Sequence, residues 1–418
     1  MDKKDIMELK KRLKKDQCTF SKVCGCYVNA EKKVVTTFRE TFLNLDDTEL
    51  HKYLEISKKV LSGTVGNNIL ELSFPIRLNE SNDRQNVLMK LKSTQLKDNE
   101  LLEDFYQKII DHYEYVGNFI ILLFHDNYDV MSRTTDNIKL DESEEVYEYI
   151  LCAICPVSLS NPGLSYFEEV NKIKARERDW MVDAPITGFV FPAYTDRSSD
   201  VNKVMYYTKN AKNPHVEIME EVLGCDAKQT STIQKDSFQA LIKGSLEVDE
   251  AKADLIYMDV QDSLSYMLED QKAMGDDAEP IALTHEDMEI LLKDSGISQD
   301  VSAKIGETYD EYFGKDLPLA EYLLDTKVLK ANDQRKIEVH LRKQVEILSN
   351  ELIQVKNNVN EEANTEKNEE NEEYHIILQV KPEKVSSIRT QLIDGQRCLV
   401  IPVNENEYTK VNGKGDMI

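Results

Sequence analysis

Two apolar runs joined by a charged bend constrain the fold of this chain more than any other feature. The run from Ile186 to Tyr194 is apolar on both alternating faces, as expected of a strand that is covered on both sides. A second run, from Val204 to Thr208, is rich in the aromatic and β-branched residues that favour strands. The connection carries five polar residues, Asp196, Arg197, Ser198, Ser199 and Asp200. Held between buried strands, such a connection could form a functional loop on a rigid scaffold.

The size and charge of the chain limit the classes of protein to which it can belong. Its 418 residues are enough for two or three domains. The 52 basic residues against 77 acidic ones give a formal net charge of -25, which repels nucleic-acid backbones and anionic membranes. The apolar runs are far shorter than the ~20 residues of a membrane-spanning helix. The N-terminus has no apolar signal core, and the seven cysteines fit reduced thiols, so we expect a cytoplasmic protein.

The first half of the chain mixes strand and helix patterns, which predicts an α+β domain over residues 1–211. Helical patterns cover residues 2–15, 47–61 and 83–115, the last with a break near residues 98–99. Strand patterns cover a hairpin at 19–28 and 33–38, and three further runs at 69–76, 116–124 and 145–157. The run at 116–124 is expected to end at His125 and Asp126.

The predicted helix at residues 2–15 is basic, unlike the rest of the chain. It carries Lys3, Lys4, Lys10, Lys11, Arg12, Lys14 and Lys15 around an apolar stripe. It is the one segment that could dock an acidic partner or a nucleic acid. Because isolated charge runs are usually solvated faces, we favour a helix that rests against the acidic body of its own chain.

Residues 63–68, Gly-Thr-Val-Gly-Asn-Asn, resemble a phosphate-binding loop only superficially. Such loops leave a strand and open a helix, so that the positive end of the helix faces the phosphate. Here the glycines follow a helix, whose C-terminal end carries partial negative charge. We therefore expect Gly63 to cap the preceding helix.

The second half is expected to be mainly helical over residues 212–330. The helical patterns cover residues 216–223, 237–246, 251–272, 285–294 and 298–313, with a loop at 275–280. Thr284 and Asp287 have the spacing of a capping box.

A helical arm and an acidic linker are expected over residues 331–373. Within the helix predicted at 333–359, the spacing alternates between four and three at Leu341, Val345, Leu348, Leu352, Val355 and Val359, as in a coiled coil. The arm could form a homodimer, fold back on the helical region, or bind a partner protein. The Glu- and Asn-rich tract at 361–373 predicts a disordered linker.

Residues 374–418 are expected to form a small β module that packs on the helical region. Strands are expected at 374–380 and 397–403, with a turn at 411–413.

Five polar residues at the ends of predicted elements are candidate catalytic groups: His125, Asp126, Asp196, Arg197 and His215. Carboxylates and imidazoles at strand ends can ligate a divalent metal or act as acid and base, and the planar fork of Arg197 suits a phosphate. A structural role explains these residues equally well, because such side chains also stabilise turns, pair with acidic groups and cap helices. No spacing motif enforces their convergence, and neither Gly-x-Ser-x-Gly nor His-Glu-x-x-His occurs.

The same bend is also a candidate surface for a ligand or partner protein. The residues concerned are Tyr194, Asp196, Arg197, Ser198, Tyr206, Tyr207 and Lys209.

Four cysteines raise the question of a zinc site: Cys24, Cys26, Cys152 and Cys155. Cys-Gly-Cys is not a usual zinc spacing, and nothing in the sequence brings the two pairs together. Thiols packed as small hydrophobic groups are the favoured interpretation, and we expect no metal and no cofactor.

Several motifs carry a resemblance to a known family. They are Gly188-Phe-Val-Phe-Pro-Ala-Tyr-Thr-Asp-Arg-Ser198, Tyr206-Tyr-Thr-Lys-Asn210 with His215, Cys24-Gly-Cys-Tyr-Val28, Lys381-Pro-Glu-Lys384, Ile393-Asp-Gly-Gln-Arg397 and Val411-Asn-Gly413. In these motifs the chain resembles DUF4317, an uncharacterised bacterial family of unknown function, over nearly its whole length. The resemblance implies a bacterial cytosolic protein and no particular activity. The heptad arm and acidic tract depart from the family pattern, which implies that they extend out of a single C-terminal module.

Two hypotheses about function follow. The first is a non-enzymatic cytosolic interaction or regulatory protein with a recognition surface around the Asp-Arg-Ser loop. The second is a metal- or phosphate-handling hydrolase or nucleotide-binding enzyme that uses Asp196, Arg197, His125 and His215.

Overall fold

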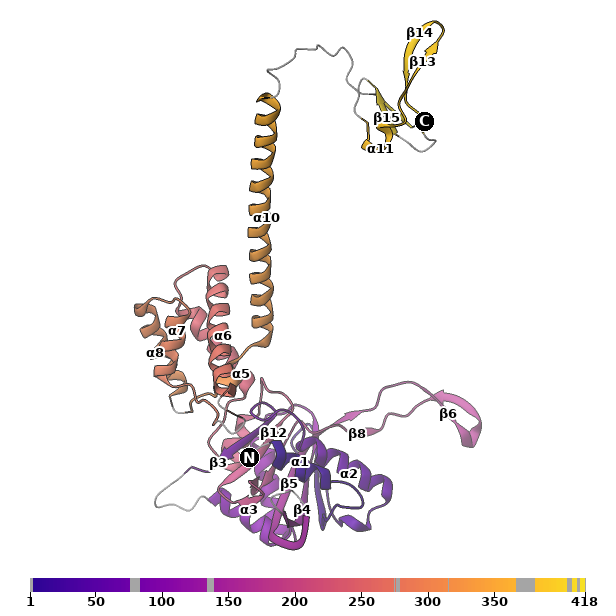
Figure 1. The fold of residues 1–418 in the computed structure, drawn as a ribbon. Helices are drawn as coiled ribbons and strands as arrows, with labels where there is room; N and C mark the ends of the chain where they lie inside the picture. Colours follow the sequence, from indigo (N-terminus) through magenta and orange to yellow (C-terminus); the bar gives the residue numbers. More distant parts are fainter. Residues whose placement is uncertain are drawn as a thin grey trace. The chain divides into compact units, whose positions relative to one another are not determined.

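A computed structural model shows the chain as two units, Met1–Arg335 and Lys336–Ile418 (Figure 1). It describes residues 3–75, 83–133, 139–273, 275, 279–314, 316–365, 380–403, 408–411 and 414–417. The first unit combines an antiparallel sheet with helices, which confirms the predicted α+β class.

An eight-stranded antiparallel sheet is the centre of the first unit. The strand order is β2-β1-β4-β5-β9-β12-β3, and β8 pairs with β5 outside this path. The strands are β1 (Lys22–Val28), β2 (Val34–Thr41), β3 (Ile69–Ser73), β4 (Asn118–Arg133), β5 (Lys139–Leu159), β8 (Trp180–Val182), β9 (Thr187–Phe191) and β12 (Lys203–Thr208). The predicted hairpin at 19–38 is confirmed as β1 and β2.

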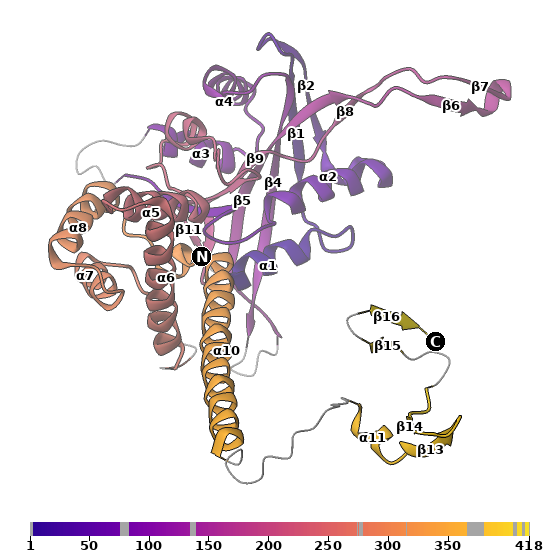
Figure 2. The same cartoon turned by 90° about the horizontal axis from the view of Figure 1, so that it is seen from above.

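Helices cover both faces of this sheet, which Figure 2 shows nearly edge-on. One face packs against α3 (Asp83–Ser93), α4 (Asn99–His112) and a π-helix, η3 (Ile218–Leu223). The other face packs against α1 (Lys3–Arg12) and α2 (Asp47–Val60). This two-sided cover explains why residues 119–124 of β4 and 150–155 of β5 are apolar on both faces. The break near residues 98–99 is confirmed, since Asp98 caps the N-terminus of α4.

The strand that begins near residue 118 does not end at His125 and Asp126, as the sequence suggested. β4 continues to Arg133, paired with β5 along almost its whole length. The polar residues do not break the strand because each finds hydrogen-bond partners within the protein.

The central stretch is two strands rather than one. β9 ends at Phe191, a cis peptide bond precedes Pro192, and β10 (Ala193–Thr195) pairs with β11 (Ser198–Asp200). Asp196 and Arg197 form the turn between β10 and β11, with φ of 51° and 61°. Two consecutive residues with positive φ are what a tight hairpin turn requires.

A two-stranded arm that the sequence did not predict projects from the sheet between β5 and β8 (Figure 1). It consists of β6 (Leu164–Phe167), the 3-10 helix η2 (Glu168–Val170) and β7 (Lys172–Ala175).

Five helices form a second core within the first unit. They are α5 (Ser231–Ser245), α6 (Glu250–Ala273), α7 (His285–Asp294), α8 (Gln299–Phe313) and α9 (Ala320–Leu323). The Thr284 and Asp287 capping box is confirmed. The glycine loop at 63–68 holds the start of α5, because Gly66 accepts a hydrogen bond from the Ser231 amide and Asn67 accepts two from Thr232.

A long helix, α10 (Thr326–Thr365), crosses the boundary between the two units. It confirms the predicted helical arm and extends it at both ends. Residues 361–365, expected in the linker, are helical, as the good helix formers Glu and Ala allow. Among the described helices, none combines the length and apolarity that a membrane crossing needs.

The rest of the second unit contains one short helix and two hairpins. These elements are α11 (Pro382–Val385), β13 (Arg389–Ile393), β14 (Gln396–Val400), β15 (Tyr408–Val411) and β16 (Lys414–Met417). The linker at 366–373, the strand expected at 374–379 and the turn at 412–413 lie outside the described residues, as do residues 274 and 276–278 at the predicted loop.

Candidate functional site

The five candidate catalytic residues occupy three separate environments. His125 and Asp126 are neighbours on β4, and successive side chains of a strand point to opposite faces. Asp126 therefore lies on the side of α1 and α2, and His125 lies on the side of α3 and α4. Asp196 and Arg197 lie on the same face of the sheet as Asp126, beside α1. His215 lies on the opposite face, which α3 and α4 cover.

Asp126 is the centre of a buried polar network beneath α1. Its carboxylate accepts hydrogen bonds from the hydroxyls of Tyr149, at 2.6 Å, and Thr19, at 2.5 Å. Arg12 of α1 lies 3.5 Å from the same carboxylate and donates to Thr19. Burial and the adjacent carboxylate raise the pKa of Tyr149 well above its ordinary value, so this hydroxyl stays protonated and donates.

The network continues along α1 to the hairpin turn. The Arg12 guanidinium stacks on the Tyr128 ring, 3.7 Å from its centroid, and the Tyr128 hydroxyl donates to Glu8 at 2.6 Å. Glu8 also lies 3.4 Å from the Nε atom of Arg197. One chain of contacts thus joins Asp126 to Arg197 through α1.

The Asp-Arg-Ser turn contacts α1 through two backbone amides and Arg197, and it contacts β5 through Ser198. The backbone amides of Asp196 and Arg197 donate to the carboxylate of Asp5 in α1, at 3.3 and 3.4 Å. Ser198 donates to Glu145 of β5 at 2.8 Å. The turn therefore holds α1 against the sheet. Of the proposed recognition residues, Asp196, Ser198 and Lys209 are exposed.

His125 forms a separate chain of hydrogen bonds on the other face. Its Nδ1 lies 2.7 Å from the Ser21 hydroxyl, and its Nε2 lies 3.0 Å from the Glu148 carboxylate. A nucleophile, a base and an orienting acid are linked in this order in hydrolases. His125 is completely buried, however, so a substrate cannot reach its ring in this conformation.

His215 lies far from His125 along the same face. Its Nδ1 lies 2.9 Å from Glu217, and its ring contacts Tyr113, which packs on Phe119 of β4. Phe119 precedes His125 by six residues, which is roughly 20 Å along a strand. The two histidines and the Asp196-Arg197 pair therefore do not line a common pocket.

The three tyrosines of the proposed recognition surface are core residues. Tyr194, Tyr206 and Tyr207 are buried. The hydroxyl of Tyr206, for example, donates to the carbonyl of Pro214 and accepts from Thr187. Sequence patterns do not separate a buried tyrosine with an internal partner from one that meets a ligand.

The four candidate zinc cysteines do not form a cluster. Cys152 and Cys155 stand three residues apart on β5, which places them on opposite faces of the sheet. Burial raises the pKa of each of the four thiols. Among the described residues, no three His, Cys, Asp or Glu side chains gather as metal ligands would.

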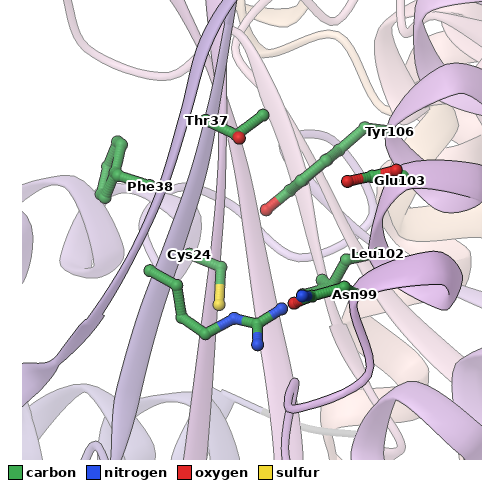
Figure 3. A pocket seen from close by; sticks show the side chains of 8 residues that line it. Cys24, Thr37, Phe38, Asn99, Leu102, Glu103 and Tyr106 are labelled. Carbon is green, nitrogen blue, oxygen red and sulfur yellow. The ribbon is translucent and has the colours of Figure 1, made fainter.

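A pocket that the sequence did not predict lies between the edge of the sheet and the start of α4 (Figure 3). Its volume is about 240 Å³, and it is lined by Cys24 of β1, by Thr37, Phe38 and Arg39 of β2, and by Asn99, Leu102, Glu103 and Tyr106 of α4. Figure 3 shows the phenol of Tyr106 and the thiol of Cys24 pointing into it.

The charged and polar groups of this pocket have few partners in the protein. Arg39 donates one hydrogen bond to the carbonyl of Lys97, at 3.0 Å, and its guanidinium adjoins Cys24. Burial nevertheless keeps the pKa of Cys24 raised, so the thiol is neutral. Burial also raises the pKa of Tyr106, whose hydroxyl has no hydrogen-bond partner.

The sequence held only a weak signal for this pocket. Cys24 and Arg39 are opposite one another on β1 and β2, a pairing that the predicted hairpin could have given. Asn99 and Glu103, four residues apart, share one face of α4. Nothing local, however, predicts that this face meets that hairpin.

Comparison with known proteins identifies the family. A family model described as "Domain of unknown function (DUF4317)" matches residues 1–414. The chain belongs to this family. No curated protein and no solved structure matches the chain. The DUF4317 match covers both units and confirms the resemblance seen in the motifs, and it assigns no activity to the polar network, to the histidines or to the pocket.

Proposed function

We propose that this DUF4317 protein is a non-enzymatic interaction or regulatory protein of the bacterial cytoplasm, and that it self-associates through α10. The observation that carries the proposal is the exposed apolar stripe of this helix. Leu341, Val345 and Leu348 are 53%, 66% and 59% exposed, although such side chains are normally buried. The seven free cysteines support a reducing compartment.

A second copy of α10 is the occupant that best fits this stripe. The alternate spacing of four and three places Val345 at heptad position a, and Leu341 and Leu348 at position d. A β-branched residue at a with leucine at d favours a parallel pair of helices, and this combination occurs in the heptad around Val345, whereas the next a position is Leu352. The charge of this segment also allows two copies to pair. Between residues 336 and 354, three basic residues balance three acidic ones: Lys336, Arg342 and Lys343 against Glu338, Glu346 and Glu351. Two such segments can therefore approach despite the acidity of the chain.

The start of α10 is fixed to the helical core of the first unit. Asn332 is buried and donates to Asp262 of α6 at 2.7 Å. Arg335 pairs with Asp259 of α6 at 3.0 Å. A helix that is anchored at one end and apolar beyond its anchor supports a role in assembly.

The test is the solution mass of the full chain and of two variants, measured by sedimentation equilibrium. We expect the wild-type chain to have twice the mass of the 48.2 kDa monomer. Leu341→Lys combined with Leu348→Lys puts two charges into the seam and should give a monomer. Asn350→Lys adds one such charge outside the seam and should remain dimeric. A monomeric wild-type chain, or a double variant that stays dimeric, refutes the proposal.

A further inference from the structure

We propose that the pocket between β1, β2 and α4 binds a small zwitterion, a free amino acid in particular. The carboxylate of the ligand pairs with Arg39, and its ammonium group pairs with Glu103. This inference is independent of the proposed self-association, because the pocket lies entirely within the first unit.

Two opposite charges line this pocket without pairing with each other. Arg39 comes from β2, and Glu103 comes from α4. Within the described part of the chain, the contacts of Arg39 are with the Lys97 carbonyl and the Cys24 thiol, and Glu103 has no ion pair. A guanidinium has five N–H donors in a planar fork that matches a carboxylate. A ligand with one negative and one positive group can pair with Arg39 and with Glu103 at the same time.

Tyr106 provides the independent evidence that the pocket is built for a polar ligand. The residue is only 4% exposed, and its hydroxyl has no hydrogen-bond partner. Buried polar groups are nearly always paired, so an unpaired hydroxyl that points into a pocket needs a partner there. Figure 3 shows it directed toward the space between Thr37 and Cys24. As a protonated phenol, it donates to a ligand carboxylate.

The start of α4 determines which end of the ligand lies where. Asn99 is the first residue of this 14-residue helix, and the N-terminal end of a helix carries partial positive charge. This end, the Asn99 amide and Arg39 together favour the carboxylate. Glu103 is one turn further along the same face and receives the ammonium group.

The size and lining of the pocket limit the ligand. At about 240 Å³ it is smaller than the roughly 300–1,000 Å³ of pockets for drug-sized molecules. A nucleotide is therefore too large. Leu102 adds apolar surface, whereas the ring of Phe38 packs on the other face of the sheet, and this lining suits an amino acid with a short apolar side chain such as alanine or valine.

The experiment is saturation-transfer NMR on the full-length protein, followed by calorimetry. The probes are L-alanine and L-valine, together with N-acetyl-L-alanine, which lacks the ammonium group, and L-alaninamide, which lacks the carboxylate. We expect at least one zwitterion to bind and both single-charge analogues to bind at least tenfold more weakly. Failure of both zwitterions to bind at millimolar concentration overturns the proposal. Equal binding of N-acetyl-L-alanine also overturns it, in favour of a simple anion site.

Variants locate the binding. Arg39→Gln and Glu103→Gln should each weaken binding at least tenfold, and Tyr106→Phe, which removes one oxygen and keeps the ring, should weaken it severalfold. Glu100→Gln changes an exposed residue of the same helical turn outside the pocket and should have no effect. Because Glu103 is exposed, its variant will fold even if the Arg39 variant does not. Unchanged binding in Glu103→Gln and Tyr106→Phe places the ligand elsewhere and refutes the assignment.

Discussion

Removal of the Asp126 carboxylate should destabilise the first unit more than almost any other single change of a charged residue. Asp126 is buried, and its oxygens accept from Tyr149 and Thr19 and face Arg12. In Asp126→Ala, the buried Tyr149 hydroxyl loses its acceptor, and Arg12 loses its counter-charge. The breaking of a buried ion pair by removal of one partner costs about 3–5 kcal/mol.

The expected loss is at the lower end of this range. The Arg12 side chain is 15% exposed, so water compensates part of its lost pairing. We therefore expect Asp126→Ala to lower the free energy of unfolding by about 3 kcal/mol. Asp126→Asn keeps the shape and one acceptor oxygen, and should cost about 1–2 kcal/mol. Tyr149→Phe removes one donor and should cost about 1 kcal/mol.

Urea denaturation followed by tyrosine near-ultraviolet circular dichroism measures these losses, because several buried tyrosines surround the network. With a slope of roughly 1–3 kcal/mol per molar urea, the midpoint of Asp126→Ala should fall by about 1–3 M. Asp129→Ala, an exposed aspartate three residues along the same strand, is the matched control and should change stability by less than about 0.5 kcal/mol. If the two alanine variants shift the midpoint equally, Asp126 is not the centre of the network.

Three further predictions concern packing, acid stability and thiol reactivity. A methyl group added at Gly188 would lie 2.4 Å from a backbone carbonyl oxygen of β5, so Gly188→Ala should lower the free energy of unfolding by about 3 kcal/mol. Gly163→Ala is the control, because a methyl group there meets nothing within 4 Å, and it should be neutral in the same urea titration. Burial alone would raise the pKa of Glu217, but hydrogen bonds from His215 and the backbone lower this pKa below the ordinary 4.5. The charged Glu217 therefore contributes stability above pH 4.5, and this contribution is lost as the pH falls through the lowered pKa. Glu217→Gln should therefore lower the melting temperature at pH 7 more than at pH 3, and an equal drop at both would contradict this. Iodoacetamide should label Cys398 first in the native protein, because the other six thiols are buried. If peptide mass spectrometry finds another cysteine labelled as fast, the result would count against the fold.

Local patterns predicted those parts of the fold whose causes are local. The apolar run at 186–194 indicated a strand covered on both faces, and β9 is such a strand. The Thr284 and Asp287 spacing indicated a helix start, because a capping box needs only four consecutive residues.

The rest depends on contacts between residues that are distant in the sequence. β4 runs past Asp126 because Arg12 and Thr19, more than 100 residues earlier, satisfy its carboxylate. The candidate site could not be predicted for the same reason. Its charges come from Arg39 and Glu103, which only the packing of α4 on the β1 and β2 hairpin brings together. The strands of the β6 and β7 arm have only four residues each and no buried face, so the alternation in Lys172-Ile-Lys-Ala175 is too short to mark a strand in the sequence.

The measurement that tests the proposed assembly most directly is disulfide cross-linking at the seam of α10. In a Cys398→Ser background, Leu348→Cys places a thiol at heptad position d, where the two copies of a parallel pair bring equivalent residues within disulfide reach. Asn350→Cys places a thiol on the outer face as the control. We expect mild oxidation to convert the Leu348→Cys chain into a covalent dimer and to leave the Asn350→Cys chain monomeric. A Leu348→Cys chain that stays monomeric, or equal cross-linking of the two variants, would contradict it.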